Sequence, residues 1–152
     1  MTLASPKEKL VMLVDDDASI LDLVDHVVKK EGFKSERAED GEEGLKKILA
    51  RKPDLVVLDI MMPGRGGFHL IKELQKSAET KDIPVLIVTG RYNDPETADM
   101  IRNEHNVRGY VQKPVKPASL IKLIHTMLGT RSENTDKPIE RPKGFGRSNG
   151  KS

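Results

Sequence analysis

Five short apolar runs alternate with amphipathic segments along the first 129 residues, and this alternation most constrains the fold. The expected strands are 10–14, 33–38, 55–59, 85–89 and 109–112. The expected helices, where apolar residues recur at helical spacing, are 20–28, 44–50, 68–74, 96–105 and 117–128. Continuous apolar strands separated by amphipathic helices are typical of a parallel sheet covered on both faces. The sequence therefore predicts an α/β fold, a doubly wound five-stranded parallel sheet with five helices.

The composition changes near residue 129. Residues 130–152 contain only two clearly apolar residues, Ile139 and Phe145, among several Pro and Gly. Such a segment buries too little surface to offset its ordering entropy, so we predict a disordered basic tail or a linker remnant. Six Lys and Arg against three acids give it a charge of +3, while the other 20 basic and 21 acidic residues leave −1. We favour a solubilising role over a tether to nucleic acid or an acidic partner.

Whole-chain composition excludes several classes of protein. The absence of Cys excludes a disulfide framework and thiolate metal sites. The first residues lack the apolar core of a signal peptide, and no run approaches the roughly 18 apolar residues of a membrane span. A net charge of +2 gives no general argument for nucleic acid or an anionic membrane. We expect a cytoplasmic protein without membrane insertion.

Acids, a hydroxyl and a lysine follow four of the expected strands. Asp15 and Asp16 follow the first strand, Asp59 ends the third, Thr89 ends the fourth and Lys113 follows the fifth. Ligands of open parallel sheets bind beyond the carboxyl ends of the strands, so we expect these side chains to converge. Clustered carboxylates repel one another unless a cation intervenes. An oxygen-only ligand set favours a hard ion such as Mg²⁺.

The convergence indicates a Mg²⁺-assisted phosphoryl-transfer site. One Asp would act as the nucleophile and form an aspartyl phosphate. Lys113 and Thr89 would contact the phosphoryl oxygens, and positioning with charge neutralisation would do most of the catalysis. Each residue alone has an ordinary explanation; Asp17, for example, is well placed to cap the helix that follows it. Only the joint placement of these residues after four strands indicates a phosphoryl-transfer site.

Four motifs in this order resemble the response-regulator receiver domain (CheY-like superfamily), the phosphoacceptor module of two-component signal transduction. They are LVDDD at 13–17, VVLDIMMPG at 56–64, PVLIVTG at 84–90 and GYVQKP at 109–114. The resemblance covers residues 8–129 and implies a flavodoxin-like sheet with strand order 2-1-3-4-5.

The resemblance implies a role for each matching residue. Asp59 matches the phosphoacceptor, which takes a phosphoryl group from a sensor histidine kinase or a phosphotransfer protein. Asp15, Asp16, Asp59 and the backbone carbonyl of Met61 would hold Mg²⁺ or Mn²⁺. Lys113 matches the lysine that pairs with the phosphate, and its bond to the following proline is typically cis.

The resemblance also implies a switch. Thr89 would move toward the phosphoryl group and Tyr110 would then turn inward. The surface formed by helix 96–105, strand 109–112 and helix 117–128 would contact a downstream protein target. Such a protein is a phosphoacceptor rather than an enzyme, with only self-catalysed phosphoryl transfer and slow autodephosphorylation.

The resemblance also implies that two positions tune the lifetime of the phosphorylated state. Met61 and Arg91 lie two residues past Asp59 and Thr89, where they would hinder or screen water, so we expect phosphorylation to persist for minutes or longer. Arg65 is expected to be exposed to solvent. The four histidines show no metal-ligand spacing, and we place each of them on a helix surface.

Alternative functions stay open. Asp15 and Asp17 form the Asp-x-Asp of a haloacid-dehalogenase-like phosphatase, but that family needs an acidic pair after the lysine, and the acids beyond Lys113 all fall in the tail. The receiver is expected to stand alone; the alternative is a fragment of a longer regulator with a missing effector domain. We expect no direct DNA binding, and a monomer or a weak phosphorylation-dependent dimer.

Overall fold

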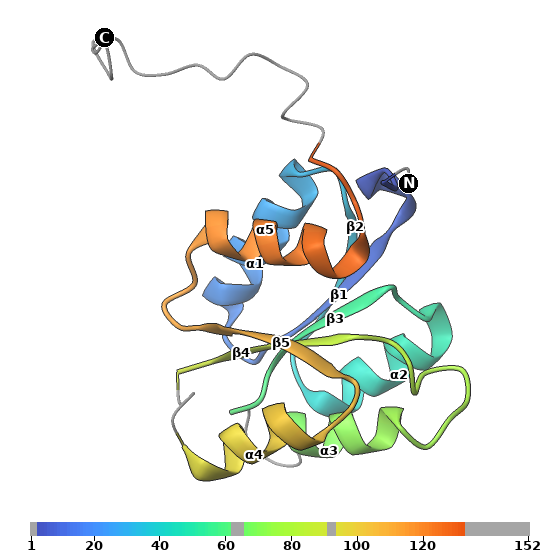
Figure 1. The fold of residues 1–152 in the computed structure, drawn as a ribbon, viewed down its shortest axis with the longest axis vertical. Helices are drawn as coiled ribbons and strands as arrows, with labels where there is room; N and C mark the ends of the chain where they lie inside the picture. Colours follow the sequence, from blue (N-terminus) through green and yellow to red (C-terminus); the bar gives the residue numbers. More distant parts are fainter. Residues whose placement is uncertain (1–2, 62–65, 91–93, 133–152) are drawn as a thin grey trace, which may run out of the picture.

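Five parallel strands form one twisted sheet in the computed structural model, which describes residues 3–61, 66–90 and 94–132 (Figure 1). The strands are β1 (Leu10–Val14), β2 (Lys34–Ala38), β3 (Leu55–Asp59), β4 (Val85–Thr89) and β5 (Val107–Gln112). Their order is β2-β1-β3-β4-β5, and every pairing is parallel. The predicted fold class and strand order are confirmed.

Helices cover both faces of the sheet. They are α1 (Ala18–Lys30), α2 (Gly41–Arg51), α3 (Gly66–Leu74), α4 (Pro95–Asn103) and α5 (Pro117–Leu128), preceded by a short 3₁₀ helix η1 (Pro6–Glu8). Helices α1 and α5 pack on one face, and α2, α3 and α4 pack on the other (Figure 1). This arrangement leaves the carboxyl ends of the strands free of covering helices, as expected for a site at that edge.

Two apolar cores lie on opposite faces of the central strands. Every residue of β3 and β4 is buried, because successive side chains of a strand point to opposite faces and both faces are covered. Val56 and Leu58 join the core under α2 and α3, whereas Leu55 and Val57 join the core under α1 and α5. The cores are mainly aliphatic, as the scarcity of aromatic residues predicts, although Phe33 is buried in the core under α1 and α5 and Phe68 packs against the other core.

Caps and tight packing set where the helices begin. The Asp17 carboxylate accepts hydrogen bonds from the backbone N–H groups of Ser19 and Ile20 and so caps α1, as predicted. Gly67, in the first turn of α3, lies so close to β3 that an added Cβ would approach the Cα of Ile60 to 2.6 Å. Only glycine allows α3 to start this close to the strand that ends in Asp59.

Several elements differ from the sequence prediction at their ends. Strand β2 begins one residue later than predicted, and helices α1, α2 and α3 begin two or three residues earlier. Strand β5 begins at Val107, two residues before the predicted start, because the Val85 N–H donates to the Asn106 carbonyl and extends the ladder with β4. Helix α4 ends at Asn103, two residues before its predicted end, so His105 lies beyond it.

The two ends of the folded part pair with each other. Ala4 forms a parallel bridge with Thr130, where the Ala4 N–H donates to the Gly129 carbonyl at 3.0 Å and the Arg131 N–H donates to the Ala4 carbonyl at 3.2 Å. Thr130 is buried. Residues 130–132, which we assigned to the tail, thus contact Leu3 and Ala4, His125 of α5, and Glu31 after α1. The predicted disorder of 133–152 lies outside the described residues.

Among the helices in the described part of the chain, none is both long and apolar enough to cross a membrane.

Candidate functional site

Three carboxylates meet at the carboxyl edge of the sheet. Asp15 and Asp16 follow β1, and Asp59 ends the neighbouring strand β3, where Val14 pairs with Leu58. One carboxylate oxygen from each lies within 4.8 Å of the others. Asp15 and Asp59 are only 4% and 5% exposed, whereas Asp16 is exposed to solvent. The predicted proximity of these residues is therefore observed.

Backbone N–H groups orient the two buried carboxylates. The Asp17 N–H donates to Asp15 Oδ1 at 2.9 Å, and the Met61 N–H donates to Asp59 Oδ1 at 3.0 Å. In both residues Oδ1 accepts a hydrogen bond from the N–H two residues further along the chain, in the turn that follows the strand. The turns therefore fix the carboxylates while each Oδ2 faces the shared space.

Lys113 reaches this space from the end of β5. Its Nζ lies 3.4 Å from Asp59 Oδ2 and 3.7 Å from Asp15 Oδ2. The Lys113 backbone N–H donates to the Thr89 carbonyl at 2.8 Å, which holds the residue beside the end of β4. The Lys113–Pro114 bond is cis, as the resemblance implied.

Burial sets the electrostatics of the acidic cluster. It raises the pKa of Asp15 from its ordinary value of 3.8 to about 6, and the nearby Asp59 charge adds to this rise. The hydrogen bond from the Asp17 N–H and the charge of Lys113 act in the opposite direction. One lysine thus faces two buried carboxylates, and the exposed carboxylate of Asp16 lies beside these two. Such an excess of carboxylate charge favours a bound cation.

The residues present fit Mg²⁺ or Mn²⁺ chemically. The cluster supplies only carboxylate oxygens, the ligands that hard divalent cations prefer. Asp16 opens the cluster to solvent, which leaves room for the water ligands that Mg²⁺ usually keeps.

The other predicted site residues lie around the cluster at different depths. Thr89 ends β4 and is fully buried. The Tyr110 side chain on β5 is 47% exposed, and that of Met61 is 41% exposed. The predictions for Arg91 and Arg65 fall outside the described residues.

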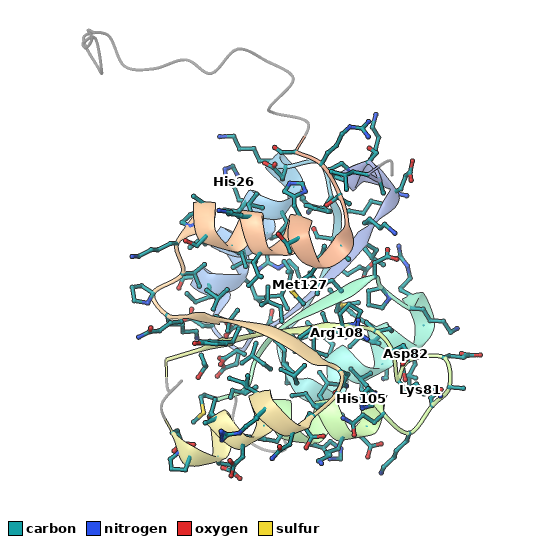
Figure 2. All side chains as sticks on the ribbon, viewed as in Figure 1. His26, Lys81, Asp82, His105, Arg108 and Met127 are labelled. Carbon is teal, nitrogen blue, oxygen red and sulfur yellow. The ribbon has the colours of Figure 1, made fainter. Side chains whose placement is uncertain are left out.

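The placement of the histidines on helix surfaces is only partly correct. His26 is exposed on α1, and Figure 2 labels it there. The prediction for His125 is wrong: its side chain is 12% exposed and lies 2.8 Å from Glu31 through Nε2. Its Nδ1 lies 2.7 Å from Thr130 Oγ1, and its ring packs 5.2 Å from that of Phe33. This burial depends on Phe33 and Glu31, which lie far from His125 in the sequence, so no local pattern indicates it.

Comparison with known proteins identifies the family. The family model for the response regulator receiver domain matches residues 11–125. Protein PilH from Pseudomonas aeruginosa is 36% identical over 118 residues, which cover 78% of this chain and 96% of PilH. The phosphate regulon transcriptional regulatory protein PhoB from Escherichia coli is 34% identical over 119 residues. That match covers 78% of this chain but 51% of PhoB, so the chain spans about half the length of that relative.

Solved structures agree with the sequence relatives. The chemotaxis protein CheY4 from Vibrio cholerae superposes with a TM-score of 0.73 and 30% identity, over 79% of this chain and 98% of CheY4. A CheY-like receiver domain protein from Methanospirillum hungatei gives a TM-score of 0.72 and 32% identity, over 79% and 93% of the two chains. The chain therefore belongs to the response regulator receiver domain family, a family of signalling domains.

Proposed function

We propose that Asp59 accepts a phosphoryl group from a phosphohistidine on a sensor histidine kinase or a phosphotransfer protein. The observation that carries this proposal is the buried Asp59 carboxylate, clustered with Asp15 and Asp16 and lying 3.4 Å from the Lys113 ammonium. An Asp59 oxygen forms a bond to phosphorus while the bond between phosphorus and the imidazole nitrogen breaks. The imidazole leaves with the electron pair of that bond.

In this proposal Asp15, Asp16, Asp59 and the Met61 carbonyl hold Mg²⁺ or Mn²⁺. When bound, the cation neutralises the charge that gathers on the phosphoryl oxygens. Lys113, whose ammonium lies 3.4 Å from Asp59 Oδ2, supplies a second positive charge to the same oxygens. The hydrogen bond from the Met61 N–H keeps the Asp59 carboxylate in one orientation.

The phosphoryl group would alter a partner-binding surface through Thr89 and Tyr110. Thr89 is buried at the end of β4, and Tyr110 lies on the adjacent strand with its ring exposed. We propose that Thr89 moves toward the phosphoryl group and that Tyr110 turns inward. The surface formed by α4, β5 and α5 then changes its affinity for a downstream protein.

Met61 and Arg91 are proposed to slow hydrolysis of the aspartyl phosphate, so that phosphorylation lasts for minutes or longer. Decay of the phosphorylated state within seconds would contradict this.

We propose that the receiver acts by binding partners rather than through an attached DNA-binding domain. The match to PilH over 96% of that protein supports this proposal. The match to half of PhoB corresponds to the alternative, a receiver belonging to a longer regulator. Comparing the molecular mass of the protein isolated from its source with that of this chain separates the two.

Labelling with acetyl phosphate tests the phosphoacceptor. We expect wild-type protein to be labelled in the presence of Mg²⁺, and Asp59→Asn and EDTA-treated protein to remain unlabelled. Asp82→Asn, at an exposed acid outside the cluster, is the matched control and should label like wild type. Equal labelling of Asp59→Asn would overturn the assignment. Rapid turnover of a phosphate ester by the same protein would instead favour the phosphatase alternative.

A further inference from the structure

Asp17 connects the acidic cluster to the start of α1. Its carboxylate Oδ1 accepts hydrogen bonds from the Ser19 N–H at 2.9 Å, the Ser19 hydroxyl at 2.6 Å and the Ile20 N–H at 3.4 Å. Its backbone carbonyl accepts from the Leu21 N–H at 3.0 Å, and its backbone N–H donates to Asp15 Oδ1 at 2.9 Å. One residue therefore bonds to the helix on one side and to a carboxylate of the cluster on the other.

The Asp17 carboxylate itself lies outside the acidic cluster. Within the described part of the chain, the three acids whose carboxylate oxygens all lie within 4.8 Å of one another are Asp15, Asp16 and Asp59. Asp17 is exposed, and its Oδ1 accepts from α1 instead. This geometry does not use Asp17 as the second acid of the Asp-x-Asp motif on which the phosphatase alternative depends. Asp17 contacts the cluster through its backbone N–H.

The turn from Asp15 to Asp17 is anchored at both ends. The Asp15 N–H donates to the Ala38 carbonyl at 3.1 Å, which ties this residue to the end of β2, while the cap ties Asp17 to α1. Asp16 lies between the two anchored residues, with its carboxylate beside those of the other two ligands. Because two anchors leave a three-residue turn few other conformations, they restrict where the Asp15 and Asp16 carboxylates can lie.

We propose that Asp17 is a positioning residue for a cation in the acidic cluster. By capping α1, its carboxylate fixes the turn, and its N–H then holds Asp15 Oδ1, so that Asp15 and Asp16 are in place before the cation arrives. The inference rests on the proposed function, because it concerns the cation that assists phosphoryl transfer to Asp59. Loss of a group that orients metal ligands typically lowers metal affinity roughly 10–100-fold, because a mobile ligand must then be ordered on binding.

Three substitutions of Asp17 separate the cap from the charge. Asp17→Ala removes both, and we expect it to weaken Mg²⁺ binding about tenfold. Asp17→Asn keeps an oxygen that can accept from α1 but carries no charge, and Asn caps helices as well as Asp does, so this variant should retain most of the affinity. Asp17→Glu keeps the charge on a side chain that is not among the preferred N-cap residues, so it should weaken binding almost as much as Asp17→Ala.

Asp40 provides the matched control for a lost helix cap. It caps α2 by accepting from the Glu43 N–H at 2.7 Å, and it lies outside the acidic cluster. Asp40→Ala should lower the free energy of unfolding, as the loss of a cap does, but leave Mg²⁺ affinity unchanged. Asp17→Ala should lower both. A cap that contributed only stability would give the same result at the two positions.

NMR spectroscopy of the full chain measures both effects of Asp17. Shifts of the backbone amide resonances during titration with Mg²⁺ alone at pH 7.5 give the affinities, and urea unfolding in EDTA gives the stabilities. Hydrogen exchange of the metal-free protein supplies a third readout. The amide of residue 17 should exchange faster in Asp17→Ala than in wild type, because loss of the cap frees the turn, whereas Asp40→Ala should not change its exchange.

Several results would overturn the positioning role. These are wild-type Mg²⁺ affinity in Asp17→Ala, an equal loss in Asp40→Ala, or no Mg²⁺ binding to wild type. Retained affinity in Asp17→Glu with lost affinity in Asp17→Asn would also overturn it, because the charge would then act directly.

Acetyl phosphate labelling of the same samples separates this inference from the proposed function. If Asp59 is labelled but Asp17→Ala binds Mg²⁺ like wild type, only the positioning role is wrong. If Mg²⁺ binds with the expected pattern but Asp59 is not labelled, the proposed function fails and the positioning role stands.

Discussion

Asp15 shows how a single buried carboxyl is held at a cost to the fold. Its pKa of about 6 in the folded protein exceeds its ordinary value of 3.8, mainly because burial disfavours the charged form. The folded state therefore binds this proton more tightly than the unfolded state does. The contribution of Asp15 to stability is complete below pH 3.8 and is lost as pH rises through about 6. At neutral pH the charged Asp15 destabilises the metal-free protein.

Asp15→Asn should therefore stabilise the metal-free protein at neutral pH. We expect a gain of about 1–3 kcal/mol in the free energy of unfolding near pH 7.5, because the amide carries no charge and can still accept the Asp17 N–H. The gain should shrink toward zero near pH 4, where folded Asp15 is protonated. Urea unfolding in EDTA at both pH values measures the difference. A variant that is less stable than wild type near pH 7.5 would contradict this explanation.

The composition of the acidic cluster could be predicted from the sequence, but the pKa of Asp15 could not. Parallel strands bring their carboxyl ends to one edge, so Asp15 and Asp59 had to lie close together once the strands were recognised. The raised pKa depends on how deeply the turn after β1 is buried, which is a property of tertiary packing. Asp17, two residues further on, is exposed, and hydrogen bonds from Ser19 lower its pKa.

At the scale of elements, strands were easier to predict than the ends of the chain. The ranges of β1, β3 and β4 match the prediction because each is a continuous apolar run bounded by polar residues or proline. The pairing of Ala4 with Thr130 joins residues far apart in the sequence and leaves no periodic pattern. The contact of His125 with Glu31 spans 94 residues and was missed for the same reason.

The His125 contacts should stabilise the junction between α1, α5 and the end of the chain. The ring contacts Glu31 after α1 and Thr130 after α5, and Ser132 also donates to Glu31. His125→Ala removes the contacts of the ring with these buried groups and should lower the free energy of unfolding by about 1–3 kcal/mol. His26→Ala, at an exposed position on α1, is the control and should change it by less than about 0.5 kcal/mol. Thermal unfolding measures both; equal effects would show that the junction contributes little.

At the scale of the whole molecule, two well-packed cores hold a repulsive cluster at the edge of the sheet. The apolar residues of β3 and β4 fix the position of Asp59 on the sheet, so the cluster cannot relax by moving apart. A cation that binds the folded state but not the unfolded chain stabilises the fold by mass action, by ~2.7 kcal/mol at a hundredfold excess over its Kd. The free energy of unfolding of the whole chain thus reports whether a cation occupies the acidic cluster.

Mg²⁺ should therefore raise the melting temperature of this protein, and the rise should depend on Asp16. Asp16 is exposed, so Asp16→Asn removes a ligand without disturbing the core and should abolish most of the shift. Asp82→Asn, an exposed acid outside the cluster, should retain the full shift. The rise should also diminish below about pH 6, where Asp15 takes up a proton and competes with the cation. Thermal unfolding with increasing Mg²⁺ tests all three statements. A shift that is the same in wild type and Asp16→Asn would locate the cation elsewhere and remove the physical basis for charge neutralisation at Asp59.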